Sequence, residues 1–91
     1  MTKPIATLGD MHTCPLHGGG PILDPGQAGV TIDGLPVAVV GGTCLCGASG
    51  TDGLTSGSPT IRIDGQAVMR VGDMTQHGGL VATGKPTVNA S

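Results

Sequence analysis

The segment GSPTIRIDG at residues 57–65 is the second copy of a pattern that first occurs as GQAGVTIDG at residues 26–34, 31 positions earlier. Such a repeat means that one short supersecondary unit is used more than once. The same offset relates the residues that continue the pattern without a gap: Val37 and Val68, Val40 and Val71, Gly41 and Gly72, and Cys46 and His77.

Each copy carries an Asp-Gly pair, Asp33-Gly34 or Asp64-Gly65, between runs of β-branched residues. Asp-Gly is a strong hairpin signal because both turn positions favour a positive φ. The sequence therefore predicts two equivalent β-hairpins. No stretch shows the 3.6-residue period of a helix.

A third copy is split between the two ends of the chain. The return arm of each hairpin is an octad, LPVAVVGG at 35–42 and QAVMRVGD at 66–73, and a third octad, KPIATLGD, occupies 3–10. Its missing partner is GKPTVN at 84–89, which matches the start of the segment at 57–65. We therefore expect an all-β, pseudo-threefold body in which the terminal strands pair and close the set.

The composition favours one small domain, residues 1–91, whose core needs an additional cross-link. The chain has no Phe, Trp or Tyr and 18 Gly, so Val, Ile and Leu must form the core. Small scaffolds with such cores commonly add a metal or disulfides. Three Cys in a chain without a signal-peptide pattern argue against a disulfide framework. The Gly-rich stretches 18–25 and 47–55 are expected to be loops.

Charge and hydropathy exclude several functions. Four Lys and Arg in a chain of net charge −2 provide no basic surface for nucleic acid. No apolar run is long enough to cross or stably anchor in a membrane. We expect a protein made and kept in the cytoplasm, unless a non-classical route exports it.

All His and Cys residues follow the end of an octad. Six residues share this placement: His12, Cys14 and His17 after the first octad, Cys44 and Cys46 after the second, and His77 after the third. Isolated His and Cys residues are usually loop or core residues. Six of them at matched repeat positions instead indicate a metal site, and the three units would then converge on one ion.

The preferred ligands are His17, Cys46 and His77, one from each unit, with His12 in the fourth position. Three imidazoles and one thiolate suit tetrahedral Zn²⁺, and iron is less favoured. Cys14 and Cys44 are alternative thiolate ligands, because alternation along a strand places Cys44 on the same face as Cys46.

A closed four-ligand site is structural, because zinc catalysis needs an open position. The carboxylates do not indicate an enzyme either. Asp33 and Asp64 are predicted turn residues, and Asp24 before Pro25 and Asp52 before Gly53 are also interpreted as turn chemistry. No nucleophile–base arrangement is visible.

The octads and their flanking segments resemble the PAAR-repeat family, over nearly the whole chain. The residues that carry the resemblance are the octads 3–10, 35–42 and 66–73, the hairpin segment 57–65, and the segments 9–15 and 72–79. No copy contains the sequence Pro-Ala-Ala-Arg in full, and Gly42 replaces the Asp that follows Gly in the other octads.

The resemblance implies a stand-alone, cone-shaped spike tip of the type VI secretion system with zinc near its vertex, held by three His and one Cys. A monomer would cap and sharpen a trimeric VgrG β-helix for membrane piercing and could carry effectors. Assembly would take place in the cytoplasm, and the apparatus would export the protein to the extracellular space or a target cell. The VgrG-binding residues are not predicted.

Two other classes of function compete with this structural role. A cytoplasmic metal-trafficking or redox protein would use Cys44 and Cys46 with Cys14, and would show accessible thiols and exchangeable metal. A small zinc hydrolase would use three His ligands and a bound water, with Cys46 off the metal.

Overall fold

The computed structural model of the chain describes residues 3–14, 18–47 and 50–90, apart from the side chains of residues 86 and 87. This part of the chain is all-β and contains no α-helix, as the sequence predicts. Its strands are β1 (Lys3–Ile5), β2 (Met11–Thr13), β3 (Gly20–Asp24), β4 (Thr31–Ile32), β5 (Leu35–Pro36), β6 (Thr43–Leu45), β7 (Thr51–Gly53), β8 (Arg62–Ile63), β9 (Gln66–Ala67), β10 (Leu80–Val81) and β11 (Lys85–Ala90).

The two predicted hairpins are β4–β5 and β8–β9. Asp33 and Asp64 have φ values of 54° and 52°, and the glycine after each has a φ of 81°. Positive φ at both central positions is the turn geometry that matches the twist of paired strands. The Asp-Gly pairs therefore determine where the chain reverses.

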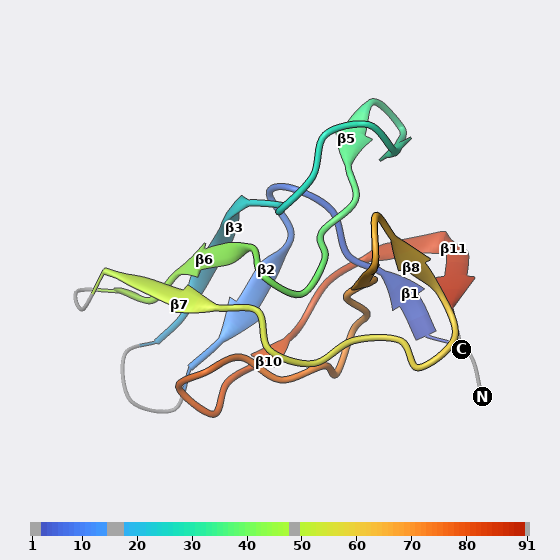
Figure 1. Ribbon diagram of the computed structural model, residues 1–91. Coiled ribbons are helices and arrows are strands. Elements are labelled where there is room, and N and C mark those ends of the chain that lie inside the picture. The colour runs from blue at the N-terminus through green and yellow to red at the C-terminus, as the bar shows by residue number, and fades with distance from the viewer. Residues whose placement is uncertain (1–2, 15–17, 48–49, 91) are drawn as a thin grey trace.

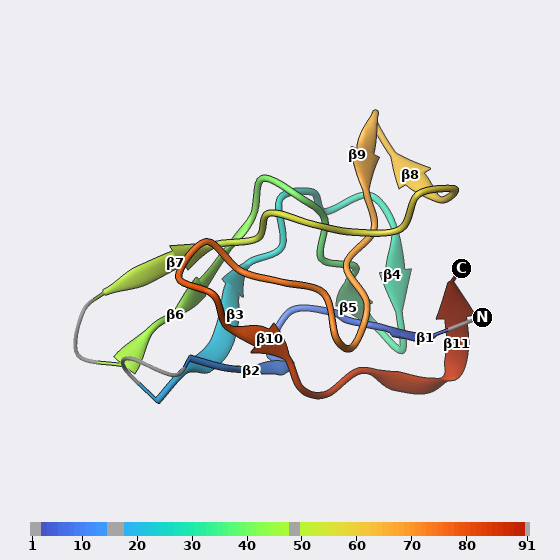
Figure 2. The ribbon, with the colours of Figure 1, turned by 90° about the horizontal axis from the view of Figure 1, so that it is seen from below.

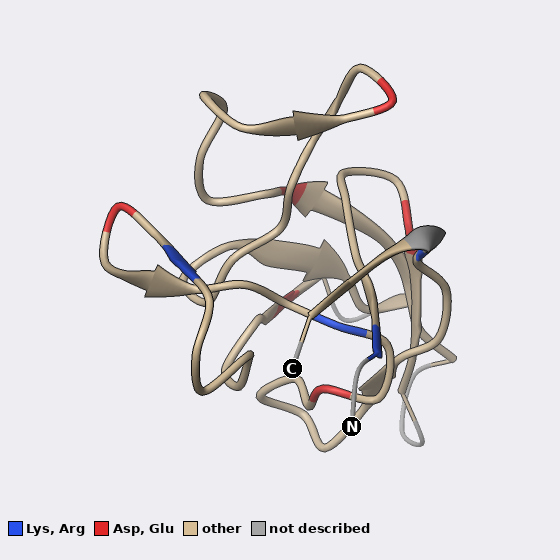
Figure 3. Cartoon of the chain, turned by 90° about the vertical axis from the view of Figure 1, so that its right-hand side faces the viewer, with Lys and Arg blue, Asp and Glu red and all other residues tan. Residues whose placement is uncertain are grey.

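The third hairpin is divided between the ends of the chain, as predicted. β1 pairs antiparallel with β11, and Lys3 lies opposite Ala90. Figure 2 shows this pair at the same end of the molecule as β4–β5 and β8–β9. Figure 3, which looks onto that end, shows the two complete hairpins and the terminal pair spread around the centre. We call this end the hairpin end.

Three octads form a closed ring of backbone hydrogen bonds at the centre of the molecule. The amide of Ala38 donates to Ala6, that of Met69 donates to Ala38, and that of Ala6 donates to Met69, at 3.0, 2.9 and 3.0 Å. A second ring has the same symmetry: Leu8 donates to Pro36, Val40 to Ala67 and Val71 to Pro4, at 2.8, 2.8 and 2.9 Å. The pseudo-threefold arrangement is thus confirmed at the level of individual bonds.

Two clusters of mostly aliphatic side chains make up much of the core in the described residues. One cluster surrounds the ring: Ala6, Ala38, Met69, Ile22, Leu54, Val81 and Cys44. A second cluster lies among the hairpins: Ile5, Val37, Val39, Val68 and Ala90. Without aromatic residues, the largest side chain on the ring is Met69, which is fully buried.

The turn at the end of each octad is held by an acid, except in the second copy. Asp10 Oδ2 accepts the amide of Thr7 at 2.8 Å, and Asp73 Oδ2 accepts that of Arg70 at 2.7 Å. In the second copy the carbonyl of Pro25 accepts the equivalent amide, from Val39, at 2.8 Å. A side chain at Gly42 would meet the backbone of this passing segment, which explains the glycine there.

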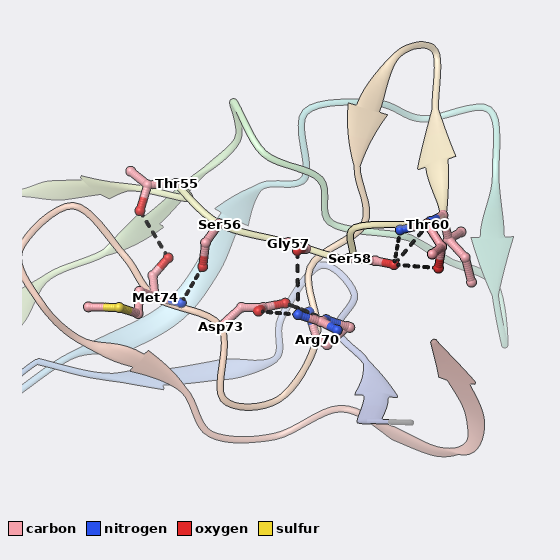
Figure 4. Close-up of polar contacts among 9 residues, drawn as sticks. Thr55, Ser56, Gly57, Ser58, Thr60, Arg70, Asp73 and Met74 are labelled. Carbon is pink, nitrogen blue, oxygen red and sulfur yellow. Dashed lines mark hydrogen bonds and ion pairs between the residues drawn. The ribbon is translucent and has the colours of Figure 1, made fainter. Parts of the chain in front are cut away.

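Arg70 also packs its guanidinium group against Asp73. Nε and Nη2 lie 2.9 and 2.8 Å from the two carboxylate oxygens, and Nη2 reaches the carbonyl of Gly57 (Figure 4). The hydrogen bond to Asp73, and the charge of that carboxylate, raise the pKa of Arg70 above its ordinary value despite partial burial. The bidentate pair closes the turn at the end of the third octad. The hydrogen bond to Gly57 links that octad to the segment that precedes β8.

A curled five-stranded sheet, in the order β10-β2-β3-β6-β7, forms the other end of the molecule (Figure 1). It includes β3 and β7, which lie in the stretches 18–25 and 47–55, so the expectation of loops there was wrong. Pairing with β2 and β6 overrides the weak strand propensity of their Gly and Pro residues.

The body is broad at the hairpin end and narrows toward the β6–β7 end (Figures 1 and 2). Its principal extents are 30, 26 and 22 Å, so the body is compact. Within the described residues, no helix is long and apolar enough to span a membrane.

Candidate metal centre

Cys46 and His77 meet near the narrow end, although they belong to different units. Cys46 directly follows β6, and His77 lies in the turn before β10. The Sγ atom of Cys46 is 3.1 Å from Nδ1 of His77. Cys46 is fully buried, whereas the His77 side chain is 32% exposed. Two of the predicted ligands, related by the repeat, are therefore in direct contact.

Asp52 lies beside these two residues. It belongs to β7, opposite Cys44 of β6, and only 1% of its surface is exposed. Its Oδ1 accepts the backbone amide of His77 at 2.9 Å and lies 3.9 Å from Nδ1 of the same residue. The interpretation of Asp52 as a turn residue was wrong, because the Gly-rich segment around it pairs as a strand.

His12 approaches Asp52 from β2. Its side chain is buried, and Nδ1 lies 2.9 Å from the carbonyl of Gly20. The other ring nitrogen, Nε2, is 3.6 Å from Asp52 Oδ2. Among the described residues neither of these two buried atoms has a hydrogen-bond partner. His12 thus presents an unsatisfied nitrogen toward the centre.

The donor atoms form two groups that share Asp52. Within each group, one potential ligand atom per residue lies within 4.8 Å of the others: Cys14, Cys46, Asp52 and His77 in the first, and His12, Cys44 and Asp52 in the second. His12 is therefore placed beside the first group and not within it. His17, the remaining predicted ligand, lies outside the described residues.

The three cysteines differ in their surroundings. Cys14 and Cys44, the two alternative ligands, are both buried. Burial, followed by the nearby Asp52, Cys46 and Cys14, raises the pKa of the Cys44 thiol to about 12. Its Sγ donates to the carbonyl of Asp52 at 3.3 Å. Cys44 therefore behaves as a neutral hydrogen-bond donor beside the centre.

These residues fit a metal ion. Sulfur, imidazole nitrogen and carboxylate oxygen donors lie close together in a buried space, and two of the buried donor atoms have no hydrogen-bond partner in the described part of the chain. Buried polar atoms in native proteins are nearly always satisfied by hydrogen bonds, water or an ion. Mixed thiolate and imidazole donors are typical ligands of zinc.

The family model of the PAAR motif matches residues 16–83, which is most of the chain. The chain belongs to the PAAR family. The PAAR motif points to the spike-tip proteins of the type VI secretion system, a structural family that associates with the VgrG spike. A comparison with curated proteins finds no match to this PAAR chain.

Sequence reasoning missed the part played by Asp52 in this PAAR site. The only available signal was the position of an acid just after the Cys44–Cys46 arm, where a hairpin would bring it back beside those thiols. Glycines at 47, 50 and 53 conceal that hairpin, because they resemble a loop.

Proposed function

We propose that this PAAR protein caps a trimeric VgrG-type β-helix as a monomer and gives the spike its point. The closed rings of backbone hydrogen bonds carry this proposal, because they give one chain three nearly equivalent faces around an axis. Such a body fits the end of a true trimer with little symmetry mismatch.

The hairpin end is the surface proposed to contact the trimer. It is the broad end, and β4–β5 and β8–β9 are two-stranded there, so each has strand edges for main-chain hydrogen bonding. Apolar side chains on these hairpins, including Val30, Leu35 and Ile61, are exposed. Strand addition with apolar contacts is a common way to join β-structures.

The metal centre would stiffen the narrow end. We assign His12, His17, Cys46 and His77 as its ligands and zinc as the ion, with iron less favoured because a thiolate is present. Zinc would supply a cross-link between the strand β2, the end of β6 and the turn before β10. The role is structural and needs no chemical reaction at the ion.

Export follows from the same role. The protein would assemble on the spike in the cytoplasm and leave with it through the type VI apparatus, toward the extracellular space or a target cell. Effector proteins are a second class of partner, and they would use surfaces left free by the VgrG trimer.

A binding experiment with a VgrG trimer from the same source tests this function. One folded, metal-loaded monomer is expected to bind each trimer. Leu35→Asp or Ile61→Asp at the hairpin end should weaken the complex at least tenfold. The control is Leu80→Asp, which alters a similarly exposed residue on the five-stranded sheet and should leave binding unchanged.

Failure of the folded wild-type protein to bind the trimer would refute the proposal. Rapid exchange of the bound metal with a chelator, together with reactive thiols in the metal-loaded protein, would instead favour metal trafficking.

A further inference from the structure

Asp52 is a buried acid that the proposed ligand set does not use. It is almost completely inaccessible to solvent, and it is the residue that the two groups of donor atoms share. A buried carboxylate is costly unless hydrogen bonds or an opposite charge compensate it. The groups that surround its two oxygens therefore indicate how its charge is compensated.

Only one oxygen of this carboxylate is satisfied by the described protein. Oδ1 accepts the backbone amide of His77 at 2.9 Å. Oδ2 lies 3.6 Å from His12 Nε2, beyond the range of about 2.7–3.2 Å for an N–H···O hydrogen bond. Among the described residues, both Oδ2 and Nε2 lack a hydrogen-bond partner.

The hydrogen bond of His12 to Gly20 fixes which nitrogen is free. A carbonyl oxygen only accepts, so Nδ1, at 2.9 Å from it, carries the hydrogen. In the neutral imidazole Nε2 then has a lone pair, which faces a carboxylate oxygen that also has only lone pairs. A cation beside them satisfies both atoms.

The charge of the proposed centre supports the same conclusion. Zn²⁺ with one thiolate and neutral imidazoles would carry a net charge of about +1, and an uncompensated charge in a buried site is expensive. The Asp52 carboxylate makes the centre neutral. The charge of the ion would dominate the electrostatics of the site, because it is the largest charge there.

We infer that Asp52 is the charge-balancing and positioning residue of the metal centre. Its Oδ2 faces the ion together with His12 Nε2, and its Oδ1 holds the turn of His77 through the main chain. The inference rests on the proposed metal centre and adds to it a residue outside the three-His, one-Cys set.

Substitution Asp52→Asn separates this role from a purely structural one. The asparagine side-chain oxygen can still accept the amide of His77, so a residue that only fastens that turn would be replaced without loss. The negative charge is removed, and the second carboxylate oxygen becomes an NH2 group, which cannot face a cation. Zinc affinity, measured by competition with a chelator, is expected to fall about 10- to 100-fold. The absorption bands of the cobalt-substituted protein should also shift.

Asp24→Asn is the matched control. Asp24 Oδ1 also accepts a backbone amide, from Gly26 at 2.9 Å, but the residue is exposed and belongs to neither donor group. This variant should bind zinc like the wild type. Zinc affinity within twofold of wild type and an unchanged cobalt spectrum in Asp52→Asn would overturn the inference.

Two further measurements cover the remaining outcomes. If wild-type protein binds no metal, the proposed centre itself fails. If Asp52→Asn does not fold, a crystal structure of the zinc-loaded wild type decides: we expect an Asp52 oxygen in contact with the ion or with a ligand imidazole. A carboxylate bonded only to the His77 main chain would refute the role.

Discussion

The Sγ atom of Cys46 lies 3.1 Å from Nδ1 of His77, a residue at the same position in the next repeat. The two side chains meet because the repeats are arranged around an axis, so equivalent positions approach each other near the narrow end. Two residues at equivalent positions of the repeat are therefore in contact and could bind the same ion.

Substitution His77→Ala should remove a ligand. We expect bound zinc, measured by elemental analysis, to fall well below one ion per chain. The melting temperature should fall by at least about 10 °C, because metal binding and folding are coupled and each kcal/mol shifts a domain of this size by about 4–8 °C. Gln76→Ala, at the exposed neighbouring position, is the control. Unchanged zinc content in His77→Ala would exclude His77 as a ligand.

Cobalt substitution distinguishes the cysteines. If Cys46 is the thiolate ligand, the Co²⁺-loaded wild type should show a thiolate charge-transfer band, and Cys46→Ser should lose it. Cys14→Ser should retain the band, although Cys14 lies in the same group of donors. The reverse result would transfer the thiolate role to Cys14, and the absence of any band in the wild type would favour a three-His site.

Truncation of the ring residue Met69 tests the core. Met69→Ala should lower the free energy of unfolding by about 2–5 kcal/mol, because the surrounding side chains cannot fully close the resulting cavity. Met74→Ala removes the same atoms from a side chain that is 50% exposed, and should change stability by no more than about 0.5 kcal/mol. Urea denaturation measures the free energy of unfolding of both variants. Equal losses in Met69→Ala and Met74→Ala would show that the ring is not tightly packed.

Placing at residue 42 the Asp that ends the other two octads should destabilise the protein. Gly42→Asp places a side chain where the backbone of Asp24 and Pro25 passes, so we expect a loss of at least about 1 kcal/mol in the free energy of unfolding. Gly29→Ala, with no close neighbour and no positive φ, is the control and should be nearly neutral. A Gly42→Asp variant as stable as the wild type would contradict the structural reason given for this glycine.

Alkylation should spare Cys44. A pKa of about 12 leaves only about one thiol in 10⁴ ionised at pH 8, and the thiolate is the reactive form. Iodoacetamide followed by mass spectrometry of the folded, metal-free protein should therefore leave Cys44 unmodified, whereas urea should expose it. Rapid modification of Cys44 in the folded state would contradict its burial.

The sequence predicted the hairpins and the ring because these features depend on local turn chemistry and on the repeat. Asp33 and Asp64 mark the turns, and matching octads determine which strands become neighbours. Both signals are carried by residues close together in the chain or related by a fixed offset, so they can be recognised without a structure.

Strands β3 and β7 and the burial of Asp52 could not be predicted in the same way. Gly20, Pro21 and Gly53 have low strand propensity, and their pairing depends on neighbours supplied by the closed fold. An acid before a glycine is usually a turn residue. Only the return of β7 beside β6 places Asp52 among the donors, and the glycines at 47, 50 and 53 give that return the composition of a loop.

The octad ring also determines how the body would respond to load. Within each ring an octad donates to one neighbour and accepts from the other, and the two rings run in opposite directions. No octad can therefore be pulled away without breaking hydrogen bonds on both of its sides. A force on any one arm is therefore shared by all three, and the molecule should yield as a single unit under compression.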